Sequence, residues 1–352
     1  MLVNILRNPE LCRSLSLREW DLLIRQARRS ELLARLHHIF ACNELIETIP
    51  EAPLLHLDSA RLIADRHAVA VRWEVKQIAI ALHDSGVAPI LLKGAAYLIG
   101  ELPPCFGRVF NDIDIIVPVE RLGEVESILF LHGWASYGMS DYDKEYYRRW
   151  MHEIPPLRHV KRKTVIDVHH RILPRTSRSQ PSSDKLLAAA VTLDEKTGVK
   201  AFAPIDMVLH SACHLFYEGE FDHGLRDLVD LDALLTEFSS RGDSFWSDLM
   251  DRADELELLR PLFYALRYTR DILGTSIPGS VSGGGVGTSF IGARWMDSLF
   301  HRGLMPDHAS CNDSFTGIAR WLLFVRGHYL RMPLRLLVPH LVRKAFVEDM
   351  KS

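Results

Sequence analysis

The stretch from residue 89 to residue 117 constrains the fold more than any other part of the sequence. It begins with Pro-Ile-Leu-Leu over residues 89–92, a short apolar run that predicts a buried strand. Lys93 and Gly94 follow and are predicted to turn the chain into a short helix over residues 95–99. This strand and helix are expected to begin an α/β unit that extends to about residue 172.

A second buried strand is predicted over residues 113–117, where four of the five residues are apolar and β-branched. Side chains alternate along a strand, so Asp112 and Asp114 are expected to share one face. Two adjacent carboxylates repel each other, and a divalent cation that prefers oxygen ligands, magnesium or manganese, removes that conflict. The alternative is an exposed strand end whose acids are solvated.

The motifs Leu92-Lys93-Gly94, Arg108 and Asp112-Ile113-Asp114 resemble, in this order, those of the DNA polymerase β-like nucleotidyltransferase superfamily. Within it they look like the uncharacterised nucleotidyltransferase family and, more distantly, the AbiEii-type toxin nucleotidyltransferases. The resemblance implies a small mixed β-sheet core, an NTP substrate and Mg²⁺ or Mn²⁺ bound by carboxylates. The superfamily usually has Gly-Ser or Gly-Gly at its turn, whereas here Ala95 follows Gly94. Lys93 is therefore expected to replace the missing hydroxyl.

The resemblance also implies a third carboxylate on a strand beside the first pair. Residues 157–160 and 164–169 flank Lys-Arg-Lys and are predicted to form a β-hairpin. Asp167 fits the third position, because it lies inside an apolar run where an unpaired charge is costly. The alternative is a hairpin aspartate paired with a nearby arginine. His169 shares its face and either orients a ligand or is a structural histidine.

These residues receive roles under the resemblance. Asp112, Asp114 and Asp167 would be catalytic and would ligate the metal. Lys93 and the backbone amides of Gly94 and Ala95 would hold the triphosphate at a helix N-terminus. Arg108 would contact a phosphate by a bidentate interaction.

A helix that Asp206 is expected to cap carries two histidines, His210 and His214, one turn apart. Histidines at this spacing can bind zinc, but Ser211 stands where a zinc protease has glutamate. The two histidines are therefore expected to line the cleft or to lie in the core. On the next helix, the family resemblance implies that two residues face the nucleotide or acceptor: Arg226 and Asp230. A structural ion pair between them is the alternative.

The overall prediction is an α+β fold, in which a small mixed-sheet nucleotidyltransferase core over residues 86–175 is flanked by helical subdomains. Residues 1–85 are expected to be helical, with a Ser16/Glu19 capping box and a long helix capped by Asp58. Residues 184–350 are expected to form a C-terminal helical domain. The Ser-, Arg- and Pro-rich segment before it, residues 175–184, is typical of a linker or exposed loop.

Two C-terminal features have no assigned chemistry. The glycine-rich segment 279–287 is predicted to be a flexible loop, because no Lys-Ser/Thr follows it as in a phosphate-binding loop. Residues 314–347 contain no acid but several arginines. They either form a core helix with snorkelling arginines or bind an anionic acceptor or phospholipid.

Composition limits the remaining function classes. The 352 residues are 47% hydrophobic with a net charge of −3, so a sizeable core is expected and nucleic acid binding is not indicated. The five cysteines are widely spaced and odd in number, which favours reduced thiols in a cytoplasmic protein. Neither a signal peptide nor an apolar run of about 18 residues that could span a membrane is expected.

The sequence favours a metal-dependent transfer of a nucleoside monophosphate from an NTP to an unidentified acceptor, with release of pyrophosphate. One alternative is a nucleotide-sugar glycosyltransferase that uses Asp-x-Asp, although its fold normally opens with a Rossmann-like region rather than with helices. Another is a catalytically degenerate nucleotide-binding adaptor. Neither the acceptor, the base of the NTP nor the oligomeric state can be deduced from the residues.

Overall fold

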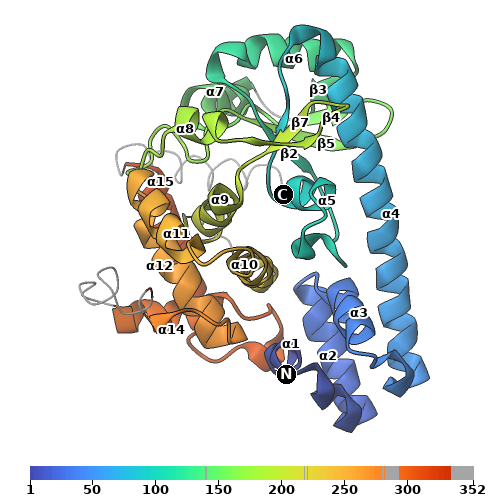
Figure 1. Cartoon of the computed structure of the whole chain (residues 1–352). Helices are drawn as coiled ribbons and strands as arrows, with labels where there is room; N and C mark the ends of the chain where they lie inside the picture. The colour runs from blue at the N-terminus through green and yellow to red at the C-terminus, as the bar shows by residue number, and fades with distance from the viewer. Residues whose placement is uncertain (139–140, 218, 220, 280, 282–292, 334–352) are drawn as a thin grey trace.

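The computed structural model describes the chain except for residues 139–140, 218, 220, 280, 282–292 and 334–352. In Figure 1 a twisted sheet occupies the upper part of the molecule, and one long helix runs along its right edge. The first three helices lie at the lower right and the C-terminal helices at the lower left. This arrangement confirms the predicted α+β fold with helical regions on both sides of a mixed sheet.

The N-terminal region is helical, as predicted. It contains α1 (Leu2–Arg7), α2 (Leu17–Arg29), α3 (Leu33–Cys42) and α4 (Glu51–Leu82). The predicted capping box is present: the Ser16 hydroxyl accepts from the Glu19 amide, and the Glu19 carboxylate accepts from the Ser16 amide at 2.8 Å.

The predicted start of α4 was wrong, because the helix begins at Glu51 rather than after Asp58. Pro53 lies in the first turn, where a helix has no intrahelical partner for its N–H groups, so the missing proline donor costs nothing there. Asp58 is instead about two turns inside the helix, and its Oδ1 lies 3.1 Å from His37 Nε2.

The sheet has seven strands in the order β3-β4-β5-β2-β1-β7-β6. Strand β2 pairs in parallel with β5 and antiparallel with β1, which in turn pairs in parallel with β7. The predicted hairpin is confirmed as the antiparallel pair β4–β5. The strands are β1 (Ile90–Leu91), β2 (Ile113–Ile116), β3 (Trp134–Ser136), β4 (Leu157–His159), β5 (Val165–His169), β6 (Val191–Asp194) and β7 (Val199–Ala201).

Helices cover the sheet and connect its strands. The helix after β1, α5 (Lys93–Ile99), begins two residues earlier than predicted. A 3₁₀ turn over residues 119–121 and α6 (Leu122–Leu131) follow β2, and α7 (Asp141–Trp150) follows β3. In Figure 1, α6 and α7 lie above the sheet, and α5 lies on the opposite side.

The prediction of a purely helical region from residue 184 was wrong for residues 191–201, which form the hairpin β6–β7 and complete the sheet. The turn of this hairpin contains Gly198 with a φ of +69°. Alternation is weak in β6, where Val191 and Thr192 are both exposed, and a half-exposed edge strand gives little period-two signal. The domain boundaries drawn from the sequence remain predictions.

The remaining helices are α8 (Ser183–Ala188), α9 (Pro204–Tyr217), α10 (Gly224–Ser239), α11 (Phe245–Glu255), α12 (Leu259–Tyr268), α14 (Ala293–Gly303) and α15 (Thr316–Arg331). Asp206 does not cap α9, because it lies in the first turn and its carboxylate binds the Arg252 guanidinium at 2.8 Å.

The segment before α8 is a loop, as one of the two alternatives predicted, but it is only partly exposed. Ser177 and Ser179 are buried, and their hydroxyls donate to the carbonyls of Leu330 and Glu257, respectively. Within α15, Arg320 forms an ion pair with Asp307. The predicted loop 279–287 and the basic residues beyond 333 lie mainly or wholly outside the described residues.

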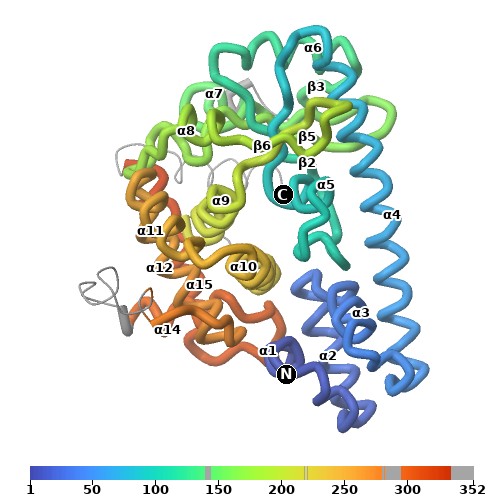
Figure 2. The backbone as a smooth tube through the Cα atoms, viewed as in Figure 1, coloured from blue at the N-terminus to red at the C-terminus, as the bar shows by residue number. Residues whose placement is uncertain are grey.

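One continuous apolar core joins the three regions, with Trp20, Ile115 and Phe216 among its members. The tube in Figure 2 shows α1 lying beside the C-terminal helical region. Gln26 of α2 bridges the two segments. Its side chain accepts a hydrogen bond from the Leu2 amide at 2.9 Å and donates one to the Ser310 hydroxyl at 2.8 Å. The N-terminal helices are thus packed against the rest of the chain.

Candidate active site

Three aspartates meet on neighbouring strands, and we call them the acidic cluster: Asp112, Asp114 and Asp167. In the parallel pair β2–β5, Asp114 lies directly opposite Asp167. Residues opposite each other in a sheet project to the same face, so the two carboxylates are neighbours. Asp112 stands two residues before Asp114 and therefore shares that face. The local alternation that the sequence predicted is present, since Ile113, Ile115 and Ile166 are buried on the other side.

The three carboxylates have different electrostatic surroundings. Burial, and then the charge of Asp114, raise the pKa of Asp167 to about 7. Its Oδ1 is buried and has no hydrogen-bond partner among the described residues. Partial desolvation and the Asp114 charge also raise the pKa of Asp112, whose side chain reaches the surface. Two members of the cluster thus resist ionisation in the absence of a cation.

Asp114 is the member of the acidic cluster whose carboxylate contacts basic side chains. Its Oδ2 lies 3.7 Å from Lys93 Nζ, and its Oδ1 lies 3.0 Å from His169 Nε2. Burial alone would raise the pKa of Asp114, but the Lys93 charge and the His169 hydrogen bond outweigh it and hold this pKa well below its usual range. Asp114 therefore stays ionised at neutral pH.

His169 lies behind Asp114 rather than in the open cleft. Its Nε2 also lies 3.4 Å from Glu153 Oε2, and its ring is next to that of His152. Burial lowers the pKa of His169, but the Asp114 hydrogen bond and the Glu153 charge raise it above the ordinary value. His152, Glu153 and His169 together bring three potential metal ligands within 4.8 Å of one another.

Lys93 occupies a strained backbone position at the start of α5. Its φ is +44°, which is uncommon for a residue with a side chain. Gly94 follows in tight surroundings, because a Cβ there would lie 3.1 Å from Arg108 Nε and 3.2 Å from Phe110 Cδ1. Ala95 is buried behind them. The turn thus brings the Lys93 ammonium beside Asp114 and the Gly94 backbone against Arg108.

Arg108 and Arg226 belong to a group of buried ion pairs that we call the arginine network, together with Arg35, Glu31, Asp227 and Asp230. Asp230 forms ion pairs with Arg108 and, at 3.3 Å, with Arg35. Arg226 forms ion pairs with Glu31 and, at 3.0 Å, with Asp227. The alternative Arg226–Asp230 pair considered from the sequence is not among these contacts, because each residue has partners from other parts of the chain.

Arg35 ties the network to the loop before Arg108. It donates to the Pro103 carbonyl at 2.6 Å and also to the Pro104 carbonyl. This approach requires Gly107, because its φ is +68° and a Cβ there would lie 2.5 Å from the Ala34 carbonyl oxygen. The N-terminal helices thereby fix the position of the loop that carries Arg108.

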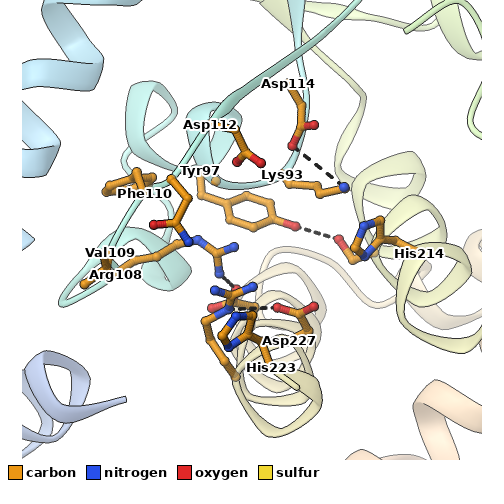
Figure 3. Close-up of a pocket in the computed structure, with 15 residues that line it drawn as sticks. Lys93, Tyr97, Arg108, Val109, Phe110, Asp112, Asp114, His214, His223 and Asp227 are labelled. Carbon is orange, nitrogen blue, oxygen red and sulfur yellow. Dashed lines mark hydrogen bonds and ion pairs between the residues drawn. The ribbon is translucent and has the colours of Figure 1, made fainter. Parts of the chain in front are cut away.

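A cavity of about 190 Å³ lies between the acidic cluster and the arginine network. We call it the Arg108 pocket, and Figure 3 shows Asp112, Asp114 and Lys93 along one side and Arg108, His223 and Asp227 along the other. Its lining residues are Lys93, Gly94, Tyr97, Arg108, Val109, Phe110, Asn111, Asp112, Asp114, Ser211, His214, His223, Arg226, Asp227 and Asp230.

The two histidines predicted on α9 separate in this structure. His214 lines the Arg108 pocket, whereas His210 is buried and packs edge-to-face against Phe202 at 5.5 Å. Burial holds the pKa of His210 well below its ordinary value, which fits a core histidine. Asp167 and His169 are not in contact with this pocket, because they lie deeper, beside and behind Asp114.

Sequence reasoning missed several lining residues, among them Tyr97, Ser211 and His223. The Tyr97 hydroxyl lies 2.5 Å from the Ser211 hydroxyl, and burial raises the pKa of Tyr97 to about 12. A signal existed for Tyr97, which is one helical turn after Lys93 and therefore on the same face of α5. The positions of Ser211 and His223 depend on how α9 and α10 pack, which no local pattern reveals.

Comparison with known families assigns the chain to a family. The chain matches the uncharacterised nucleotidyltransferase family over residues 16–274. The chain belongs to this family. The match includes the acidic cluster, the Lys93 turn and the arginine network, and it shows a nucleotidyltransferase, an enzyme of the transferase class. The more distant resemblance to AbiEii-type toxins stays a prediction.

Two further findings accompany this assignment. No curated protein matches the chain. None of the helices in the described part of this nucleotidyltransferase has the length and apolar character needed to cross a lipid bilayer.

Proposed function

We propose that this nucleotidyltransferase moves a nucleoside monophosphate from an NTP to an acceptor hydroxyl or phosphate and releases pyrophosphate. The observation that carries the proposal is the register that sets Asp114 beside Asp167, with Asp112 on the same face. The family match gives the class of transfer, and the acidic cluster provides a place for the reacting phosphate.

The acidic cluster fits a divalent cation such as Mg²⁺ or Mn²⁺. Three carboxylates supply the hard oxygen ligands that these ions prefer. The buried Oδ1 of Asp167 has no hydrogen-bond partner among the described residues, and the raised pKa values of Asp112 and Asp167 show how unfavourable the bare cluster is. When bound, the metal would stabilise charge on the attacking and leaving oxygens.

Other residues around the pocket would bind the phosphates, deprotonate the acceptor and hold Arg108 in place. Lys93 is near the cluster and would bind a phosphate oxygen, while the backbone of Gly94 allows the triphosphate to approach closely. Arg108 and Arg226 line the far side of the pocket, where they would neutralise the phosphates. Asp167 would bind the metal and would help to deprotonate the attacking hydroxyl. Asp230 would hold Arg108 in position.

This proposal is tested by transfer from α-labelled NTPs in the presence of Mg²⁺ and a cell extract as the source of acceptors. Asp112→Asn and Asp114→Asn should each reduce labelled product by roughly 10³-fold or more, because each removes a ligand charge at the reacting phosphate. Asp21→Asn is the matched control, since that exposed aspartate pairs with Arg25 on α2, away from the pocket.

Thermal unfolding without metal separates chemistry from folding in these variants. Asp112→Asn should keep or slightly raise the melting temperature, because it relieves repulsion. Asp114→Asn should lower it, because Lys93 and His169 lose an ionised partner. Full transfer by both folded variants would refute the proposal. Stabilisation of the wild type by Mg²⁺ and NTP without any labelled product would instead favour the nucleotide-binding adaptor.

A further inference from the structure

A second hollow of about 160 Å³ lies beside the Arg108 pocket, between α4 and the starts of β2 and β5. We call it the α4 groove. It shares three consecutive residues with the Arg108 pocket, Phe110, Asn111 and Asp112, so this short segment is the wall between the two hollows. The full lining is His67, Ala70, Val71, Glu74, Phe110, Asn111, Asp112, Ile113, Thr164 and Val165.

The two hollows differ in charge. Lys93, Arg108 and Arg226 line the Arg108 pocket, whereas the described lining of the α4 groove contains neither lysine nor arginine. The phosphates of a nucleotide therefore find cationic side chains in the Arg108 pocket but not among the described lining residues of the α4 groove.

The α4 groove also has few polar atoms left to bind a ligand. Its buried carboxylate, Glu74, is 1% exposed and accepts from Arg162 Nε and Nη2, both at 2.8 Å, and from the Thr164 hydroxyl at 2.7 Å. His67 Nδ1 lies 3.0 Å from the Phe110 carbonyl oxygen and so anchors the wall. What remains accessible is mainly apolar, so the groove is suited to an uncharged, apolar group.

We infer that the α4 groove binds the acceptor, and that the acceptor is an uncharged hydroxyl compound with an apolar body, such as a phenol. This inference rests on the proposed function and adds a substrate class to it. When the apolar part of the acceptor lies in the α4 groove, its hydroxyl would approach the acidic cluster at Asp112. The cationic residues of the Arg108 pocket lie on the other side of Asp112.

The transfer forms one phosphorus–oxygen bond and breaks another. The hydroxyl oxygen forms a bond to the α-phosphorus of the NTP, and its proton passes to a carboxylate of the acidic cluster, of which Asp112 lines both hollows. The bond between the α-phosphorus and the oxygen that bridges to the β-phosphorus breaks. Pyrophosphate leaves with that electron pair towards the arginine side of the pocket.

A binding experiment on the full chain tests the inference without knowledge of the natural acceptor. The probe is N-acetyl-tyrosinamide, and its binding is measured by saturation-transfer NMR in metal-free buffer. Ala70→Phe fills the groove from an exposed position of α4, so folding should be preserved. Val69→Phe adds a ring at the neighbouring exposed position, which does not line the groove, and is the matched control.

We expect the wild type and Val69→Phe to bind the probe equally, and Ala70→Phe to bind it at least tenfold more weakly. The anionic analogue 4-hydroxyphenylacetate should bind several-fold more weakly than the neutral probe, because Asp112 repels it and the groove offers no lysine or arginine among its described lining. Equal binding by Ala70→Phe, absence of probe binding to the wild type, or equal binding of the anion would each overturn the inference.

Affinity for Mg²⁺-NTP, measured on the same samples, distinguishes failure of this inference from failure of the proposed function. It should be unchanged in Ala70→Phe. Loss of the probe site with intact NTP binding supports the division between the two hollows. Failure of the wild type to bind Mg²⁺-NTP would count against the proposed function, whatever the probe does.

Discussion

The acidic cluster on the sheet and the arginine network between the helices are both charged and largely enclosed, but only the network pairs each of its charges with an opposite charge. In the network, Asp230 holds Arg108 and Arg35, and Arg226 has two carboxylate partners. In the cluster, two of the three aspartates have raised pKa values, and Asp167 has a buried oxygen without a partner among the described residues.

The charges of the arginine network are paired by folding alone, whereas those of the acidic cluster need a bound cation. The arginine network connects residues from α3, α10 and the loop before β2, so its pairs form when these regions pack together. The acidic cluster gathers like charges from two adjacent strands, and additional positive charge is needed to relieve them. Removing a charge should therefore destabilise the network, whereas removing the charge of Asp112 or Asp167 should stabilise the metal-free cluster.

The largest effect on folding should come from Asp230→Ala. This change leaves the buried Arg108 and Arg35 guanidinium groups without their shared carboxylate, and breaking a buried ion pair from one side costs about 3 kcal/mol or more. Urea unfolding should show this loss, while Asp21→Ala, in an exposed pair on α2, should change the free energy of unfolding by less than about 1 kcal/mol. A loss for Asp230→Ala as small as that of the control would show that the network contributes little.

An opposite and smaller effect is expected for Asp167→Asn. The folded chain holds a proton on Asp167 up to about pH 7, whereas the unfolded chain loses it near pH 4. Rising pH through this window therefore destabilises the wild type relative to the variant. At pH 8 without metal the variant should be more stable by on the order of 2 kcal/mol, and the difference should vanish near pH 4.

Urea unfolding at several pH values measures this change, and added Mg²⁺ sharpens the comparison. Mg²⁺ should stabilise the wild type at pH 8 and stabilise Asp167→Asn less, because the variant has lost one ligand charge. A constant difference between the two proteins from pH 4 to pH 8 would mean that Asp167 titrates normally.

The smallest effect concerns Lys93, which lies beside the acidic cluster and lines the Arg108 pocket. Lys93→Ala and Lys93→Gly both remove the ammonium group and should weaken Mg²⁺-NTP binding about tenfold, as expected for a charge-assisted contact. Glycine tolerates the positive φ of this position, so Lys93→Gly should be more stable than Lys93→Ala by about 1 kcal/mol. Calorimetric titration measures the NTP affinity, and thermal unfolding measures the stability. Unchanged NTP affinity in both variants would show that Lys93 forms an ion pair with Asp114 but does not bind the NTP.

The sequence could predict the acidic cluster because its signal is local. Alternation along residues 113–117 places Asp112 and Asp114 on one face, and the apolar run around Asp167 marks a strand. The register that brings Asp114 opposite Asp167 is a pairing across more than 50 residues, and its expectation came from family resemblance rather than from the strands themselves.

The arginine network could not be predicted in the same way. Residues 1–85 were predicted only as a helical region with no site residue, yet Glu31 and Arg35 provide partners for the pocket residues Arg226 and Asp230. No spacing in the sequence connects α3 with α10, because their contact depends on the docking of separate helices. The i,i+4 spacing of Arg226 and Asp230 even favoured a local pair that the tertiary partners replace.

Helix α4 makes the two ends of the molecule mechanically dependent on each other. Its 32 residues form a rod of about 48 Å, and after Pro53 it contains neither glycine nor proline that would let it bend sharply. It packs on α3 near its start and on α5 and α6 towards its end, with the wall of the α4 groove between them. The width of that groove is therefore set partly by helices remote from the acidic cluster. Substitutions in α3 can consequently reach both hollows, because α3 packs on α4 and also carries Arg35, which holds the loop before Arg108.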